Sequence, residues 1–205
     1  MDADRRPLVL CVAGSPRRQG NSSQLLDACA EGIEVAGGVA DWLVLADHTI
    51  KPCINCGGCS STGHCVLRDD MTAIYPRIDR AEAIVVASPV YFATVTATLK
   101  GFYDRCQPYW ARRYAIRRED RTTPVATRRP GALLLVGAGG DPYGHEAAVI
   151  PTRSVFANLE VDYAEELVVE GPDGFGDIAR YPDSLRAAQD IGWRVTELAR
   201  TRRAL

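Results

Sequence analysis

Four cysteines in one short segment carry the strongest chemical signal of this sequence. Cys53, Cys56, Cys59 and Cys65 follow the spacing CxxCxxCxxxxxC within residues 51–69. Three cysteines placed three residues apart can wrap one face of a cubane cluster, as in bacterial ferredoxins, and the fourth supplies the remaining thiolate. The glycines between them let the chain turn and offer N–H groups to the sulfurs. We therefore expect a [4Fe-4S] cluster in this cysteine-rich loop.

Other uses of these thiols stay open at this point. A structural zinc ion can take four cysteines, although it favours two separated CxxC pairs. A disulfide and free, redox-active thiols are stronger alternatives. His64 beside Cys65 could replace one ligand, although we expect a solvent-facing loop histidine. The remaining Cys11, Cys29 and Cys106 fall on apolar strand or helix positions, where cysteine packs as a small hydrophobe.

A polar loop follows the first apolar run of the chain. GSPRRQGNSS, residues 14–23, joins a strand-like run to a helix-like segment, so its N–H groups and the helix dipole would face one anion. It has neither the glycines of a dinucleotide fold nor the lysine of a P-loop. An ordinary capped turn would need only Asn21 or Ser22, and the loop holds more donors than that. We expect it to surround a phosphate that carries no metal, such as that of a flavin mononucleotide, through Ser15, Arg17, Asn21, Ser22 and Ser23.

Two further loops are expected to reach the same place. SPVYF, residues 88–92, follows another buried run and offers an apolar wall and backbone donors for a flat ring such as isoalloxazine. Tyr91 and Phe92 could instead be plain core or interface residues. GAGGD, residues 137–141, allows close backbone approach to a ligand. The expected ring contacts of the first of these loops are Pro89, Val90, Tyr91 and Phe92.

The elements that must position these loops alternate between apolar runs of strand length and longer amphipathic stretches. This pattern predicts an α/β fold with a five-stranded, doubly wound parallel sheet of order 2-1-3-4-5, helices on both faces, and one domain over residues 1–205. The expected strands are Leu8–Ala13, Ala40–Leu45, Ala83–Ala87, Ala132–Gly137 and one within Leu159–Val169. The expected helices are Ser22–Ala36, Met71–Arg80, Val95–Cys106, Glu146–Asn158 and Ser184–Arg203, with Asp70 and Asp183 as N-caps.

Composition excludes several classes of partner. The 205 residues are 46% hydrophobic and 24% charged, with a formal net charge of −2, so a globular protein without general affinity for nucleic acid or anionic membranes is expected. Neither a secretory signal nor a membrane-spanning run is evident, which predicts a cytoplasmic protein. Residues 112–129 are locally arginine-rich. We interpret them as a solvated loop or paired helix extension, with binding of a ligand phosphate as the alternative.

Taken together, the motifs resemble a known family. VAGSPRRQGNSS, CINCGGCSSTGHCVLRDDM, SPVYFATVTATLKGFYDR and GAGGD, over residues 8–141, are similar to the NADPH-dependent FMN reductase branch of the flavodoxin-like superfamily, and within it to iron-sulfur flavoproteins. The resemblance implies non-covalent FMN, a homodimer or homotetramer with flavins near the interfaces, and NAD(P)H as electron donor. It also assigns Gly139 and Gly140 to the third flavin loop. Lys100, Asp104 and Arg105 match a family helix, where we interpret them as structural or interface residues.

The resulting expectation is an FMN-dependent oxidoreductase that reduces a flavin, a quinone or another small acceptor, or exchanges electrons with a redox protein. The flavin carries the chemistry, so no protein acid or base is required. An electron carrier without its own substrate, or a thiol-based redox sensor that uses the four cysteines, is the alternative.

Overall fold

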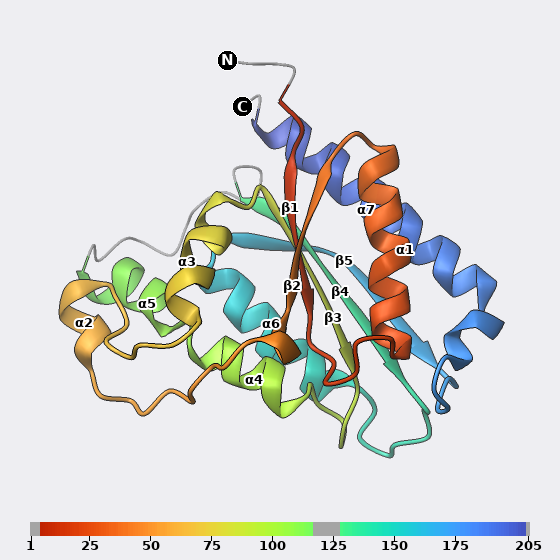
Figure 1. The fold of residues 1–205 in the computed structure, drawn as a ribbon, viewed down its shortest axis with the longest axis horizontal. Coiled ribbons are helices and arrows are strands. Elements are labelled where there is room, and N and C mark those ends of the chain that lie inside the picture. The colour runs from red at the N-terminus through yellow and green to blue at the C-terminus, as the bar shows by residue number, and fades with distance from the viewer. Residues whose placement is uncertain (1–4, 117–127, 204–205) are drawn as a thin grey trace.

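A five-stranded parallel sheet forms the centre of the molecule. The computed structural model describes residues 5–116 and 128–203. The strand order is β2-β1-β3-β4-β5, with every neighbouring pair parallel, which confirms the expected order (Figure 1). All five expected strands exist, with ends shifted by a few residues. The strands are β1 (Leu8–Ala13), β2 (Val39–Val44), β3 (Ala83–Pro89), β4 (Arg129–Gly137) and β5 (Val161–Glu170).

Helices cover both faces of this sheet because side chains alternate along its buried strands. In β1, Val9 and Cys11 belong to one buried cluster, whereas Leu10 and Val12 belong to the other. The first cluster packs under α1 (Asn21–Val35) and α7 (Pro182–Arg203). The second packs under α3 (Met71–Arg80), α4 (Ala97–Asp104) and α6 (Glu146–Asn158).

The helices α1 and α7 meet backbone to backbone at two glycines. A Cβ atom at Gly32 would lie 1.9 Å from the carbonyl oxygen of Gln189, and one at Gly192 would lie 1.9 Å from that of Cys29. Only glycine allows this approach. The crossing therefore fixes α1, whose first turn follows the polar loop, against the C-terminal helix.

Short elements account for most differences from the expected pattern. The cysteine-rich loop contains α2 (Gly58–Thr62), which was not expected. The expected helix over 95–106 ends earlier, at the last residue of α4, and the chain continues as α5 (Gln107–Trp110) and the π-helical turn η2 (Ala111–Ile116). Two 3₁₀ turns, η1 (Leu45–Asp47) and η4 (Asp177–Arg180), follow β2 and precede α7.

The two expected N-caps behave differently from the prediction. Asp70 occupies the N-cap position of α3, but its carboxylate accepts a hydrogen bond from the Thr49 N–H, 2.7 Å away. The N–H of Met71 is bonded instead by Asp69, at 3.1 Å. Asp183 lies inside the first turn of α7, because that helix begins one residue earlier with a proline, whose fixed φ suits a helix start.

The arginine-rich segment is described only in part, since residues 117–127 lie outside the described residues. Arg129 donates hydrogen bonds to the carbonyl oxygens of Ile78, Ala81 and Leu159. Arg113 donates to the carbonyl of Ala157 at 3.0 Å. These two arginines therefore join neighbouring elements through backbone carbonyls, and the guanidinium of Arg113 also lies 3.6 Å from the Glu160 carboxylate.

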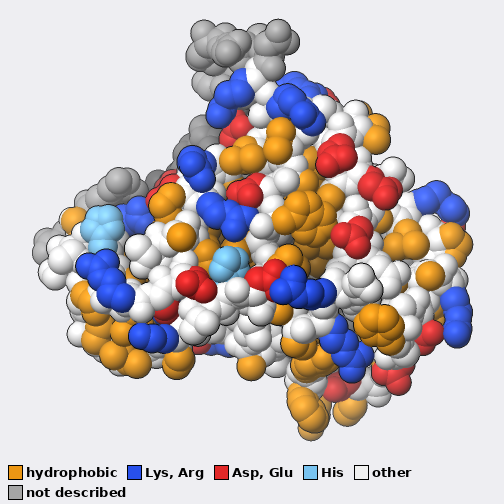
Figure 2. Space-filling model, in the orientation of Figure 1, with side chains coloured by type: hydrophobic (Ala, Val, Ile, Leu, Met, Phe, Trp, Pro, Cys, Tyr) orange, Lys and Arg blue, Asp and Glu red, His pale blue; other side chains and the backbone are white. Residues whose placement is uncertain are grey.

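The surface in view carries mixed charge. Figure 2 shows Lys and Arg side chains interspersed with Asp and Glu, and hydrophobic side chains gathered at the lower left over the segment that precedes α2. Ile54, in that segment, is 64% exposed. Within the described part of the chain, we find no helix whose length and apolar character would let it cross a membrane.

Candidate functional site

Four loops meet at the carboxyl ends of the strands and line one cavity. They follow β1, β3, β4 and β5, and the cavity lies beside the point where the strand order reverses between β1 and β3. Open α/β sheets bind ligands at this topological switch point. The lining residues are Ser15, Arg17, Gly20, Asn21, Ser22, Pro89, Val90, Tyr91, Val136, Gly137, Ala138, Pro172, Asp173 and Phe175.

The first loop is held in shape by its own side chains. The buried Ser15 hydroxyl accepts a hydrogen bond from the Arg17 N–H at 3.0 Å, and the Ser23 hydroxyl donates to the Arg17 carbonyl at 3.1 Å. The N-cap of α1 is Gly20, which has no side chain to cap the helix. The alternative of an ordinary side-chain cap at Asn21 or Ser22 is therefore wrong, and a helix start of this kind is suited to an anion.

Asn21 joins the first loop to a loop that sequence reasoning missed. Its Nδ2 donates to the Gly174 carbonyl at 3.0 Å, and its Oδ1 accepts from the Ile178 N–H at 3.2 Å. This side chain therefore fixes the loop after β5 beside the first loop. The sequence GPDGFGD, residues 171–177, gave a signal for a turn at the carboxyl end of the fifth strand, but no motif marked it as part of the site.

The second loop makes a tight turn with an uncommon backbone. Tyr91 and Thr94 exchange two backbone hydrogen bonds, of 2.8 and 3.1 Å. Between them, Phe92 and Ala93 have φ of 50° and 61°, a region that non-glycine residues rarely occupy. Phe92, at the tip of this turn, is 99% exposed and does not line the cavity that Pro89, Val90 and Tyr91 line. Such backbone outliers cluster at functional sites.

A second, neighbouring cavity lies between the second and third loops. It shares Val90 with the first cavity, and it is lined by Phe92 and Gly139. These two predicted residues therefore lie beside the cavity that the first loop lines. Gly139 and Gly140 have φ of 78° and 74°, which explains glycine at both positions, although Gly140 lines neither cavity.

His145 lines this second cavity and occupies the N-cap position of α6. Its Nδ1 is 3.7 Å from Oε1 of Glu170 and has no hydrogen-bond partner among the described residues.

Thr96 supports the first loop from below and was not predicted. Thr96 is only 3% exposed, and its hydroxyl donates a hydrogen bond to the Gly14 carbonyl at 2.6 Å. The same hydroxyl accepts a hydrogen bond from the Leu99 N–H at 3.2 Å and therefore also caps α4. A Cβ atom at Gly14 would lie 2.9 Å from the Leu99 side chain. The first loop, β3 and α4 are therefore in direct contact at this point.

The four predicted cysteines line one cavity of their own. Around it lie Ile54, Val66 and Trp110, each more than 40% exposed, and the buried Arg105. Burial raises the pKa of the Cys59 thiol, and the other three cysteines raise it further, because four like charges would gather there. The loop turns through three residues with positive φ, namely Asn55, Gly57 and Gly63. The expected role of the glycines in turning this segment is met at the last two.

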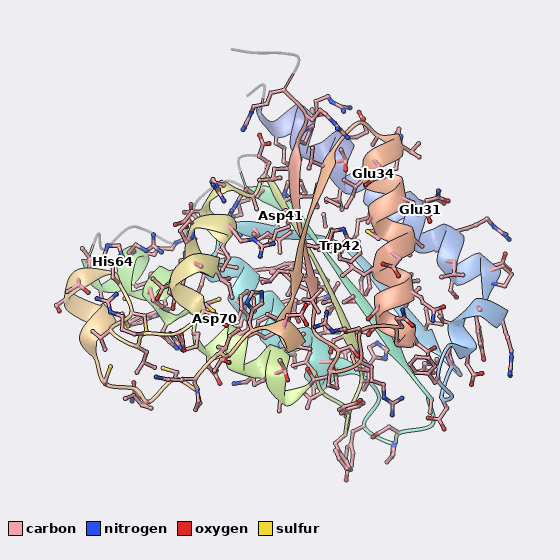
Figure 3. The ribbon with its side chains drawn as sticks, viewed as in Figure 1. Glu31, Glu34, Asp41, Trp42, His64 and Asp70 are labelled. Carbon is pink, nitrogen blue, oxygen red and sulfur yellow. The ribbon has the colours of Figure 1, made fainter. Side chains whose placement is uncertain are left out.

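The donor set of this cavity suits an iron–sulfur cluster, since thiolates are the ligands that such clusters take. All seven cysteines are free thiols. Among the described residues, no three His, Cys, Asp or Glu side chains are already gathered as a metal site. His64 is exposed and does not line the cavity; Figure 3 shows it at the outer end of the cysteine-rich loop. The four cysteines therefore share a cavity that this histidine does not line.

One short helix connects the two sites. The N-cap of α4, Thr96, bonds the first loop, and Asp104 and Arg105 at the other end line the cysteine cavity. Eight helical residues rise about 12 Å. The loop cavity and the cysteine cavity are therefore attached to opposite ends of the same rigid element.

Strand order and loop positions define a flavodoxin-like fold. The chain belongs to the NADPH-dependent FMN reductase family, whose profile matches residues 7–170. It is 31% identical over 187 residues to an iron-sulfur flavoprotein of Archaeoglobus fulgidus, covering 91% of this chain and 77% of that relative.

Solved structures show the same fold. A flavone reductase superimposes with a TM-score of 0.70 at 14% identity, over 94% of this chain and 62% of that one. The NAD(P)H:quinone oxidoreductase from Methanothermobacter marburgensis gives 0.65 at 19% identity, over 93% and 97%. At these identities the likeness concerns the fold, and the activities named belong to those proteins.

Proposed function

We propose that this chain is an FMN-dependent oxidoreductase that uses NAD(P)H or a redox protein as donor and reduces a flavin, a quinone or another small acceptor. The observation that carries this proposal is the cavity at the switch point, which loops from four strands line together. Membership of the FMN reductase family supports FMN as its ligand. When bound, FMN supplies the redox chemistry by accepting and returning electrons.

The residues of the first loop would bind the phosphate. The start of α1 at Gly20 offers backbone N–H groups, and Arg17, exposed at the cavity, offers a guanidinium to the same anion. Ser15 and Ser23 keep the loop in the shape that this requires. Ser22 completes the set that we assign to the phosphate.

The second and third loops would hold the ring. Pro89, Val90 and Tyr91 form one wall of the cavity, and the small residues Gly137 and Ala138 at the end of β4 also line it, which would leave room for a flat ligand. Phe92 lies next to it at the rim, fully accessible to a second molecule. A nicotinamide or acceptor would reach the ring from this open side.

We further propose that Cys53, Cys56, Cys59 and Cys65 hold a [4Fe-4S] cluster, which would relay single electrons between the flavin site and an external partner. The shared cavity of the four thiols and the short span of α4 support this assignment. The iron-sulfur flavoprotein name of the relative supports it as well. A homodimer or homotetramer in a reducing, cytoplasmic setting completes the proposal.

Purification without oxygen tests both cofactors. We expect FMN with about four irons and as many sulfides per chain, and a shoulder near roughly 400 nm that dithionite bleaches. Cys59→Ser should lose the iron and keep the FMN, whereas Cys29→Ala, which removes a buried thiol in α1, should keep both. A preparation without FMN would refute the central proposal.

Turnover separates the enzyme from its alternatives. NADPH consumption with a quinone or free flavin supports the oxidoreductase. Reduction only by a protein or a strong chemical donor points to an electron carrier. FMN without iron, together with cysteine alkylation that changes with oxidant, points to a thiol sensor.

A further inference from the structure

A buried arginine lies between the two ends of the cysteine-rich loop. Arg105 directly follows the last residue of α4, and its side chain is 1% exposed. Its partner Asp69 is 2% exposed. A buried charge pair is costly to form and needs further hydrogen bonds to be satisfied, so its position calls for a reason.

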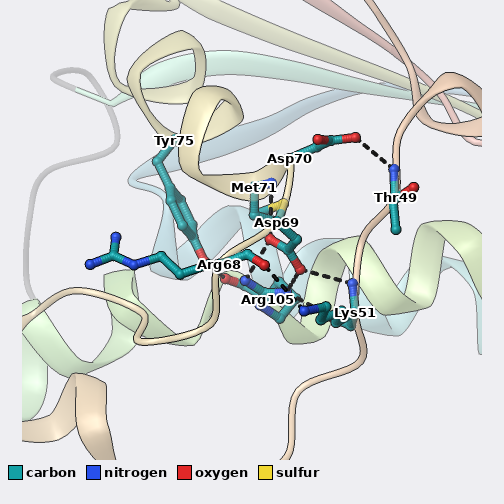
Figure 4. A network of polar contacts seen from close by, with 8 residues as sticks. All are labelled: Thr49, Lys51, Arg68, Asp69, Asp70, Met71, Tyr75 and Arg105. Carbon is teal, nitrogen blue, oxygen red and sulfur yellow. Dashed lines mark hydrogen bonds and ion pairs between the residues drawn. The ribbon is translucent and has the colours of Figure 1, made fainter.

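The guanidinium connects residue 51 to residue 69. Its Nη1 donates to the carbonyl of Lys51 at 2.8 Å and to Oδ2 of Asp69, and its Nη2 donates to Oδ1 of Asp69 at 3.1 Å (Figure 4). Oδ2 of Asp69 also accepts from the Lys51 N–H at 2.9 Å. Both ends of the loop that carries the four cysteines are therefore closed by one ion pair, which we call the Arg105 clasp.

Neighbouring bonds reinforce the Arg105 clasp on both sides. The Lys51 ammonium donates to the Arg68 carbonyl at 3.3 Å, and the Thr49 N–H bonds Asp70 at 2.7 Å. The Tyr75 hydroxyl donates to the backbone carbonyl of Arg105 at 2.8 Å. The segment before the loop and the segment after it are thus joined mainly by side chains, together with one backbone hydrogen bond from the Asp70 N–H to the Thr49 carbonyl at 3.4 Å.

One hydrogen-bond donor of the Arg105 guanidinium takes no part in the Arg105 clasp. The Nε of Arg105 is buried and has no hydrogen-bond partner among the described residues. Arg105 also lines the cavity of the four cysteines. Burial opposes the charge of Arg105, but the hydrogen bond with Asp69 and the charges of nearby groups, Cys65 among them, raise its pKa above the usual value. A buried N–H without a partner is unfavourable, and an anionic sulfur would satisfy it.

We propose that Arg105 is a positioning residue for the metal centre: its clasp holds the cysteine-rich loop closed, and its Nε–H is the donor for a sulfur in that cavity. This inference rests on the proposed cluster. It gives the guanidinium the role of an outer partner that orients ligands and tunes the centre, a role whose loss typically lowers metal affinity about 10–100-fold.

The first experiment examines the clasp without metal. Arg105→Lys keeps the charge but cannot bridge both ends of the loop, so hydrogen exchange of residues 51–69 in the metal-free chain should quicken at least about tenfold. Arg77→Lys is the matched control, since Arg77 makes a similar two-bond pair with Asp41, on β2. It should leave residues 51–69 unchanged. Equal exchange in Arg105→Lys and the unaltered chain would overturn the clasp.

The second experiment follows the metal. After reconstitution with ferrous iron and sulfide, Arg105→Lys should lose iron to a chelator about 10–100-fold faster than the unaltered chain. Arg105→Gln, which removes the charge, should also lower the reduction potential of the centre, a change that a merely structural role would not produce. Rates and potentials equal to those of the unaltered chain would overturn the inference while the proposed cluster stands.

Two other outcomes also test the proposal. If the unaltered chain takes up no iron, the proposed cluster fails, and the role of Arg105 toward it fails for that distinct reason. If Arg105→Lys does not fold, as judged by circular dichroism, Asp69→Asn replaces it, because this change removes the same ion pair from the other side. Asp69→Asn should then show the same exchange and iron loss, and unaltered behaviour would overturn the proposal.

Discussion

Removal of the buried Thr96 hydroxyl should destabilise the first loop, which we assign to the FMN phosphate, although Thr96 lies outside that loop. Thr96 connects the carbonyl of Gly14 to the start of α4, with bonds of 2.6 Å to that carbonyl and 3.2 Å from the Leu99 N–H. Thr96→Val keeps the size of the side chain and removes both bonds. The perturbation therefore acts on hydrogen bonding at the base of the loop and changes little else.

The magnitude follows from the two lost bonds. Loss of an N-cap costs about 1 kcal/mol. A buried carbonyl left without its partner adds about 1–3 kcal/mol. We therefore expect Thr96→Val to lower the free energy of unfolding by about 2–4 kcal/mol. Since Gly14 opens the loop that we assign to the phosphate, FMN affinity should fall as well.

A second buried threonine provides the control. Thr196 is 0% exposed, and its hydroxyl donates to the Gly192 carbonyl within α7 at 2.8 Å, where it caps nothing. Thr196→Val should cost about 1 kcal/mol or less. Urea unfolding gives the free energy of unfolding of both variants, provided that its dependence on urea concentration is the same as in the unaltered chain. Flavin fluorescence gives the FMN affinity. Equal losses in the two variants, or full FMN affinity in Thr96→Val, would refute the reasoning.

Three further outcomes are expected. Ser15→Ala removes the acceptor of the Arg17 N–H and should weaken FMN binding about tenfold, the equivalent of one hydrogen bond; an unchanged dissociation constant in fluorescence titration would contradict this. Asn21→Ala should release the loop after β5, so hydrogen exchange of residues 171–178 should quicken while that of α6 does not. Burial alone would raise the pKa of Asp69, but hydrogen bonds from Arg105 and two backbone N–H groups lower it in the folded protein. The ionised Asp69 therefore stabilises the fold fully above about pH 3.9, and this contribution is lost as the pH falls through the lower pKa of the folded state. Acid unfolding should therefore be shallower in Asp69→Asn, and identical pH profiles would count against the pairing.

Features that depend on local pattern could be predicted from the sequence. Apolar runs of strand length marked β1, β3 and β4 most clearly, whereas β2 and β5 include charged residues, and the right-handed crossover rule then supplied the strand order. Fixed spacing brought Cys53, Cys56, Cys59 and Cys65 to one cavity. Each of these patterns spans only a few residues, and the structural feature that it predicts is formed by the same few residues.

Features that depend on distant side chains could not be predicted. Arg105 and Asp69 are 36 residues apart, and nothing near either residue marks them as partners. Thr96 and Gly14 are 82 residues apart. The turn at Phe92 and Ala93 takes positive φ without glycine, so the usual residue signal for that backbone is missing. In each case the three-dimensional surroundings decide the conformation.

The glycine crossing of α1 and α7 has a consequence for the order of events during synthesis. The first loop and α1 leave the ribosome early, whereas Gly192 is made long afterwards. Until then α1 has no backbone surface to rest on, and its buried side chains Leu25 and Ile33 lack part of their cover. The first loop, which we assign to the FMN phosphate, is therefore fully supported only near the end of translation. In a chain stalled before α7, this loop would be complete in sequence but would lack the support of that helix.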